Sequence, residues 1–145
     1  MYTPIELLIV EDNPGDIRLY QEFFKSNRLS NNVTYVRNSA EMEKFLRREG
    51  EYEHATPPDL IMLSLRPFLL NGLQGLDPIR CHPMFKDIAL VGLMGAASEE
   101  EGLPDRSAFT SYMVKPLDLD QLRSVLTKIN SLGLVISRVP TPAQV

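Results

Sequence analysis

The sequence has a single cysteine and no tryptophan among its 145 residues. One thiol cannot form an internal disulfide or the cysteine cage of a structural zinc site, and we expect Cys81 to be a buried or half-buried small hydrophobic residue. No apolar run approaches the roughly 18 residues that a membrane-spanning helix needs. The sequence therefore excludes a disulfide scaffold and predicts a protein that does not span a membrane.

Positive charge is also scarce. There are 15 Lys and Arg residues against 19 Asp and Glu, which gives a formal net charge of −4, and no long basic block is present. Nucleic acids and anionic membrane surfaces are bound through basic patches, so neither is expected as a partner. The N-terminal residues MYTPIELLIVED lack the basic start and cleavage site of a signal peptide, which favours a cytoplasmic location.

Hydrophobic residues make up 43% of the chain, which is enough for one domain with its own core. Short apolar stretches rich in branched residues indicate buried strands. They cover residues 5–10, 33–36, 59–64, 88–94 and 111–114. We expect one domain over residues 1–139 and a flexible tail over residues 140–145.

Helix signals separate these strands. Asn13 can cap a helix that begins at Pro14, and two pairs are spaced as capping boxes: Asn38 with Glu41, and Asp118 with Gln121. A third helix is expected over residues 72–81. A fourth, over residues 95–109, is interrupted by glycine and proline and is expected to be degenerate. The alternation predicts an α/β fold with a five-stranded parallel sheet, doubly wound by helices on both faces.

In such a sheet the functional crevice lies beyond the carboxyl ends of the strands. The residues that end or follow the predicted strands are Glu11, Asp12, Ser64, Met94 and Lys115. The topology therefore predicts that these five residues share one rim of the sheet.

The motifs LLIVEDNPGD, PDLIMLSL, NGL and YMVKP, in this order and spacing, resemble the receiver domain of two-component response regulators, the CheY-like family. The likeness covers nearly the whole chain. RREGEYEHATPPDL and INSLGLVISRVP are similar to segments of small single-domain archaeal and cyanobacterial receivers, including those that serve phytochrome kinases. The resemblance implies a flavodoxin-like (βα)5 receiver fold.

The resemblance also implies roles for individual residues. Glu11 and Asp12 match the acidic pair that binds Mg²⁺ in the family, and Tyr112 matches the aromatic residue that changes rotamer on activation. Lys115 matches the lysine that contacts the phosphoryl group. Pro116 follows it, and the peptide bond before this proline is usually cis in the family.

Two positions depart from the family pattern. The aspartate that accepts the phosphoryl group aligns with Ser64, and the Ser or Thr that contacts it aligns with Met94. A serine hydroxyl is neutral at physiological pH and needs an adjacent base to attack phosphorus, whereas methionine cannot hydrogen-bond an anion in this way. With one carboxylate missing, either Glu11 and Asp12 bind Mg²⁺ weakly, or Lys115 pairs with Asp12 and no metal is required.

These departures favour a pseudoreceiver. We expect a stand-alone regulator that is not an enzyme, that requires no cofactor and that acts by protein–protein contact. Its partner would be a histidine kinase, another response regulator or a second copy, bound through the fourth helix, fifth strand and fifth helix. The alternative is a regulator that is phosphorylated at Ser64 or at another site. A flavodoxin-like cofactor protein is disfavoured, because Glu11 and Asp12 would repel a phosphate at that turn.

Overall fold

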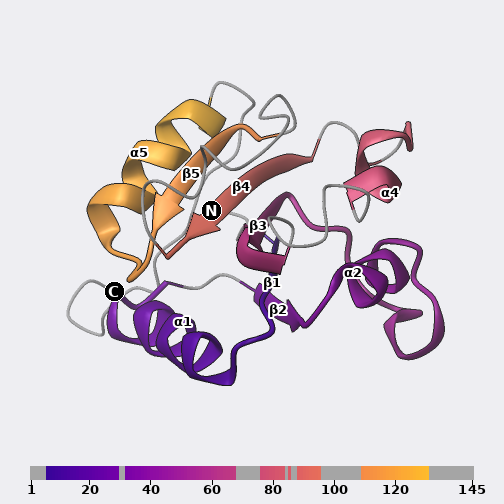
Figure 1. The fold of residues 1–145 in the computed structure, drawn as a ribbon, viewed down its shortest axis with the longest axis horizontal. Coiled ribbons are helices and arrows are strands. Elements are labelled where there is room, and N and C mark those ends of the chain that lie inside the picture. Colours follow the sequence, from indigo (N-terminus) through magenta and orange to yellow (C-terminus); the bar gives the residue numbers. More distant parts are fainter. Residues whose placement is uncertain are drawn as a thin grey trace, which may run out of the picture.

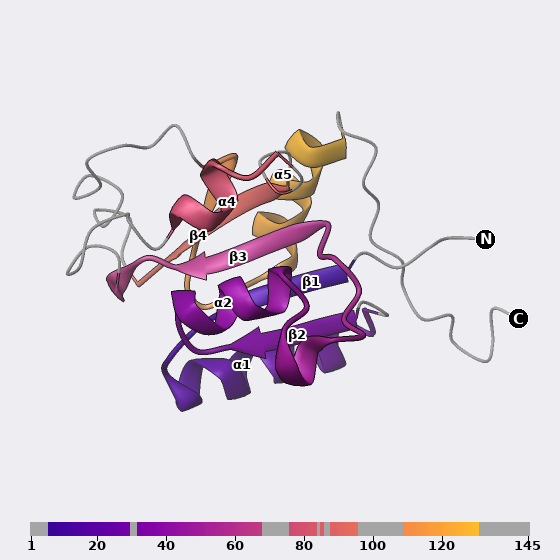
Figure 2. The same cartoon turned by 90° about the vertical axis from the view of Figure 1, so that its right-hand side faces the viewer.

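The computed structural model describes residues 6–29, 32–67, 76–83, 85, 88–95 and 109–130. These residues form a five-stranded sheet in the order β2-β1-β3-β4-β5, in which every neighbouring pair is parallel. The strands are β1 (Glu6–Val10), β2 (Asn32–Val36), β3 (Leu60–Ser64), β4 (Ala89–Met94) and β5 (Ser111–Val114). Their carboxyl ends therefore meet at one edge of the sheet (Figure 2).

Helices cover both faces of the sheet, which confirms the doubly wound α/β prediction (Figure 1). Helices α1 (Pro14–Ser26) and α5 (Leu119–Asn130) lie on one face. Helices α2 (Ser39–Leu46) and α4 (Asp77–Arg80) lie on the other, and a short 3-10 helix, η1 (Gly50–Tyr52), follows α2.

The core divides into two clusters because side chains of a strand alternate between the faces of a sheet. Leu60 and Met62 of β3 belong to the cluster beneath α1 and α5, together with Tyr20 of α1 and Leu122 of α5. Ile61 and Leu63 of the same strand belong to the cluster on the α2 face. This alternation decides which way each side chain at the end of a strand points.

Side-chain oxygens cap the N-termini of three helices. Asn13 Oδ1 accepts the Asp16 N–H at 3.1 Å, Asn38 Oδ1 accepts the Glu41 N–H at 2.9 Å, and Asp118 Oδ1 accepts the Gln121 N–H at 2.8 Å. In the two predicted capping boxes, the side chain three residues after the cap does not bond back to the N–H of the capping residue. The Glu41 carboxylate accepts the N–H of Arg37, one residue earlier than a capping box requires, at 3.0 Å, and the Gln121 amide contacts the end of β5.

Some predictions lie outside the described residues: the degenerate helix beyond Gly95, residues 72–75 of the predicted third helix, and the tail 140–145 with its domain boundary. Cys81 is exposed, so the prediction of its burial was wrong. It is the C-cap residue of the four-residue helix α4. Of the helices in the described part of the chain, none has the length and apolar character that a membrane span requires.

Candidate functional site

An open cavity of about 570 Å³ lies at the carboxyl ends of β1, β3 and β5. Four of the five residues predicted for the rim line it: Glu11, Asp12, Ser64 and Lys115. They come from three strands whose carboxyl ends meet at this edge. The prediction that these four residues share one rim of the sheet is therefore confirmed.

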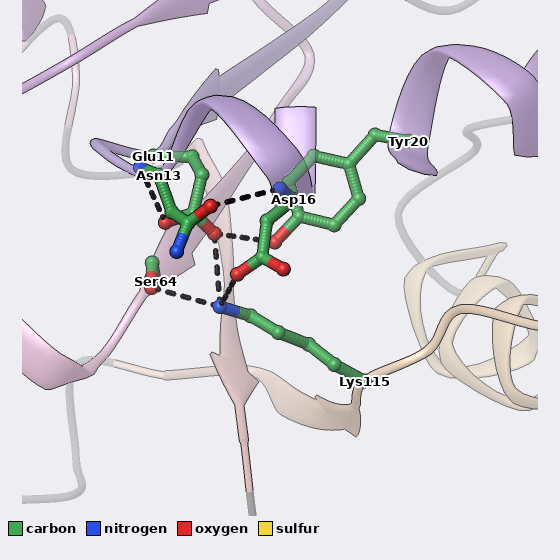
Figure 3. Close-up of polar contacts among 6 residues, drawn as sticks. All are labelled: Glu11, Asn13, Asp16, Tyr20, Ser64 and Lys115. Atoms are coloured by element: carbon green, nitrogen blue, oxygen red, sulfur yellow. Dashed lines mark hydrogen bonds and ion pairs between the residues drawn. The ribbon is translucent and has the colours of Figure 1, made fainter. Parts of the chain in front are cut away.

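The Lys115 ammonium is the centre of the site (Figure 3). Its Nζ donates to Glu11 Oε1 and to Asp16 Oδ2, both at 2.9 Å, and to Ser64 Oγ at 3.2 Å. An ammonium has three N–H donors, so these contacts use all of them. The lysine thereby connects β5 to α1, to β3 and to the residue that follows β1.

Glu11 is the buried member of the acidic pair, with 2% of its surface exposed. Its Oε1 also accepts a hydrogen bond from the Tyr20 hydroxyl at 2.5 Å, and its Oε2 accepts the Asn13 N–H at 3.3 Å. Asp12, the next residue, is exposed. The predicted pairing of Lys115 with Asp12 was therefore wrong: residues after a strand still alternate in direction, and Glu11 takes the inward position.

Burial and the hydrogen bonds and charges of this cluster shift the pKa values of Lys115 and Tyr20. Burial alone lowers the pKa of Lys115, but its hydrogen bonds to Glu11 and Asp16 and the charges of these carboxylates outweigh burial and raise it. The pKa of the Tyr20 hydroxyl is also raised, by burial first and then by its hydrogen bond to Glu11. The lysine therefore remains a cation, and the tyrosine a neutral donor, near neutral pH.

Ser64 ends β3 and is 3% exposed. It continues the alternation of Leu60 and Met62, so its side chain lies on the α1 face of the sheet, as Glu11 does. Its Oγ accepts a hydrogen bond from the Lys115 ammonium. The group that contacts the hydroxyl is thus a proton donor, which cannot serve as the base that a serine nucleophile needs.

Met94 ends β4 and is 5% exposed, but its side chain does not line the cavity with the other rim residues. It belongs to the core cluster on the α2 face, opposite the face of Ser64 and Glu11. Only its backbone reaches the rim, where its carbonyl accepts the Lys115 N–H at 2.8 Å. The methionine therefore contributes apolar packing to the core.

Tyr112 packs inward from β5 against the same cluster as Met94. Its ring lies 5.4 Å from the ring of Phe109, centroid to centroid. Gly92, its register partner on β4, makes room for the ring: a Cβ at this position would lie 2.7 Å from Tyr112 Cδ1. Pro116, which follows Lys115, is exposed and has the cis peptide bond that the resemblance implied.

The donor set does not fit a divalent cation. Mg²⁺ binds oxygens at roughly 2.0–2.1 Å in octahedral geometry, whereas the oxygens of Glu11, Asp16 and Ser64 are arranged at 2.9–3.2 Å around a nitrogen. Within the described residues, no group of three or more Asp, Glu, His or Cys side chains could hold a metal ion. Glu11, one of the two predicted ligands, is instead engaged with Lys115 and Tyr20.

Sequence analysis missed Asp16 and Tyr20 as parts of the site. Asp16 lies in the first turn of α1, and Tyr20 lies four residues further along the same helix. Their spacing carries a usable signal, since residues four apart lie on the same face of a helix. A helix that begins directly after the first strand would present both of them to the rim.

The sheet order β2-β1-β3-β4-β5, with acidic residues after β1 and a lysine after β5, defines a flavodoxin-like α/β protein of the receiver type. No family model matches the sequence. The chain is 29% identical to the response regulator Rcp1 of Synechocystis over 138 residues, 94% of each chain. Rcp1 has been solved in an Mn²⁺-bound form, which is similar at a TM-score of 0.64 and 28% identity, with 95% of this chain and 100% of that chain covered.

Two further solved structures are similar over most of their length. The phosphorylated cyanobacterial phytochrome response regulator RcpA is 30% identical, with 92% of this chain and 99% of that chain covered and a TM-score of 0.64. The bacteriophytochrome response regulator RtBRR is 26% identical, with 98% of this chain and 87% of that chain covered and a TM-score of 0.76. The chain belongs to the response regulator receiver (CheY-like) family and is a response regulator of two-component signalling.

Proposed function

We propose that this response regulator is a pseudoreceiver, which acts by protein–protein contact and accepts no phosphoryl group at the end of β3. The observation that carries the proposal is the position of Ser64. A buried neutral hydroxyl, which accepts a hydrogen bond from Lys115, lies where the family places a carboxylate nucleophile.

The surroundings of Ser64 oppose nucleophilic attack by its hydroxyl. Glu11 is the carboxylate that shares the Lys115 ammonium with Ser64, and both of its oxygens already accept hydrogen bonds. Glu11 therefore has no unengaged oxygen to accept the serine proton. No catalytic step follows from this arrangement, and we infer that the protein is not an enzyme.

The family's aromatic switch also has little room to operate here. Met94 and Tyr112 pack in one core cluster, and the Tyr112 ring fits against Gly92. Methionine has no hydroxyl group that could move toward a bound anion and so vacate space for the Tyr112 ring. We infer that Tyr112 keeps its inward position whether or not a ligand is bound at the rim.

A histidine kinase is the partner that the relatives favour, because RcpA and RtBRR are described as phytochrome and bacteriophytochrome response regulators. One surface suited to docking is a groove of about 240 Å³ between α1 and residues 115–117. Leu19 lies at this groove and is 57% exposed. The other expected partner is a second copy or another response regulator, bound through β5, α5 and the helix predicted over residues 95–109, most of which lies outside the described residues.

The proposal is tested by adding Mg²⁺ and beryllofluoride, a mimic of aspartyl phosphate, and following amide chemical shifts. Resonances of Tyr112 and its neighbours on β5 should not move, because the rim has no carboxylate at position 64 to bind the reagent. RcpA, which has been solved phosphorylated, serves as the positive control. Saturable shifts at Ser64 and Tyr112 would show that the receiver switch is intact.

Partner binding is measured separately. Light scattering over a range of concentrations reports a homodimer, and pull-down with a phytochrome-type histidine kinase reports a kinase partner. Binding is expected to be equal for the wild-type chain and for Ser64→Ala, since the hydroxyl plays no part in it. A protein that stays monomeric and binds neither a kinase nor another regulator would contradict action by contact.

A further inference from the structure

The Lys115 ammonium lies where carboxylates from two segments converge. Glu11 Oε1 and Asp16 Oδ2 are both 2.9 Å from Nζ, and Ser64 Oγ completes the set at 3.2 Å. The carboxylate of Glu11 is almost fully buried, with 1% of its side chain exposed, while Lys115 is 19% and Asp16 28% exposed. A buried carboxylate requires a nearby cation, and here that cation is the chain's own Lys115 side chain.

We infer that the Lys115 ammonium is the resident cation of this site, and that it excludes Mg²⁺ and Mn²⁺ by occupying the position and the oxygens that a divalent ion would need. The distances are those of N–H···O hydrogen bonds and not of metal coordination. Rcp1, by contrast, has been solved with Mn²⁺ bound.

A metal ion could enter the site only if more than one hydrogen bond of the Lys115 ammonium were broken. Glu11 Oε1 would have to lose its hydrogen bond from Lys115, and it would have to coordinate the metal while it still accepts the hydrogen bond from the Tyr20 hydroxyl. Asp16 would have to turn from the same ammonium, which would then remain half-buried beside a divalent cation. The repulsion between these two cations opposes binding.

This inference goes beyond the proposed function and fails independently of it. A chain that takes no metal could still be phosphorylated by some other route, and a chain that takes metal could still act only by contact. The metal response is therefore measured without any phosphodonor or partner.

The test compares thermal unfolding in EDTA with unfolding in millimolar Mg²⁺ for the wild-type protein, Lys115→Met and the double variant Glu11→Gln/Lys115→Met. The wild-type melting temperature should be the same in both buffers. Lys115→Met should melt lower in EDTA, by about 5–10 °C, because the carboxylates lose their counter-charge. Mg²⁺ should restore part of that loss in Lys115→Met and none in the double variant.

Paramagnetic broadening by substoichiometric Mn²⁺ provides a readout that does not depend on whether Lys115→Met folds. Wild-type amide resonances of residues 11–16 and 64 should keep their line widths. Selective broadening of these resonances in the wild-type protein, a wild-type melting temperature that rises with Mg²⁺, or a folded Lys115→Met with no response to Mg²⁺ would each overturn the inference.

Discussion

Glu11 and Asp12 are neighbours in sequence but differ in environment. Glu11 is buried and accepts hydrogen bonds from Lys115, Tyr20 and Asn13, whereas Asp12 is exposed at the cavity mouth. The family resemblance treats the two as an equivalent pair of ligands. The structure makes Glu11 the internal partner of a lysine, so the two should respond differently to removal of their charge.

Glu11→Gln should lower the free energy of unfolding by about 1.5–3 kcal/mol, because a charged acceptor of a buried hydrogen-bond network is lost. Asp12→Asn, the matched control, should change it by less than about 0.5 kcal/mol. Urea unfolding measures both. Equal effects at the two positions would contradict the assignment of Glu11 as the internal partner.

Gly92 decides the position of Tyr112. A Cβ added at Gly92 would lie 2.7 Å from Tyr112 Cδ1 and 3.1 Å from Leu65 Cδ2. Gly92→Ala should therefore destabilise the fold by about 1–3 kcal/mol through overpacking. In a Tyr112→Leu background the same change should cost much less. A cost that does not depend on Tyr112, measured by a double-mutant cycle, would show that the ring is not held by this contact.

At the scale of elements, the Gln121 side chain links α5 to the end of β5 by hydrogen bonds. Gln121 Oε1 accepts the Val114 N–H at 2.7 Å, and its Nε2 donates to the Val114 carbonyl at 2.8 Å. β5 is an edge strand, whose outer backbone groups would otherwise be open to pairing with another chain. The helix thus covers the last residue of that edge.

Gln121→Leu should remove this cover while keeping the size of the side chain. The Val114 amide should then exchange its hydrogen about fivefold to tenfold faster, which corresponds to the loss of roughly 1 kcal/mol of hydrogen bonding. Ser124→Ala, at an exposed position of α5, is the control. Unchanged protection of Val114 in Gln121→Leu would mean that the amide is protected by other contacts.

Asp118, at the start of α5, provides a pH test. Its pKa is lowered first by the hydrogen bond from the Gln121 N–H and then by the bond from the Gln121 side chain. The contribution of Asp118 to stability is therefore fully present above the ordinary aspartate pKa of about 3.9, and it is lost as pH falls through the lower pKa of the folded state.

Asp118→Ala should consequently be less stable than the wild-type protein at neutral pH, and this difference should shrink below about pH 4. Urea unfolding at a series of pH values measures it. A difference that stays constant down to the pH of acid unfolding would exclude the Asp118 carboxylate as its source.

At the scale of the whole molecule, local sequence patterns predicted the helices and strands but not the contacts between residues far apart in the sequence. Strand ranges followed from apolar runs, and the starts of α1 and α2 followed from Asn13 and Asn38, because these signals lie within a few residues of the element that they specify. The contact of Lys115 with Asp16 joins residues 99 apart in sequence. Pairing of this kind depends on how α1 is placed against the end of β5.

The same limit explains the wrong assignment of the Lys115 partner. Sequence alone placed Glu11, Asp12 and Lys115 on one rim but did not weigh the inward alternation of Leu7, Ile9 and Glu11. The prediction that Cys81 is buried was wrong for a related reason: the exposure of a side chain depends on packing against segments distant in the sequence.

The most direct test of the central claim, that position 64 accepts no phosphoryl group, is mass spectrometry after incubation with acetyl phosphate and Mg²⁺. RcpA is treated in parallel as the positive control. The account predicts an unchanged intact mass for this protein and no modified peptide that contains Ser64. A stable phosphoryl adduct on Ser64 would contradict it.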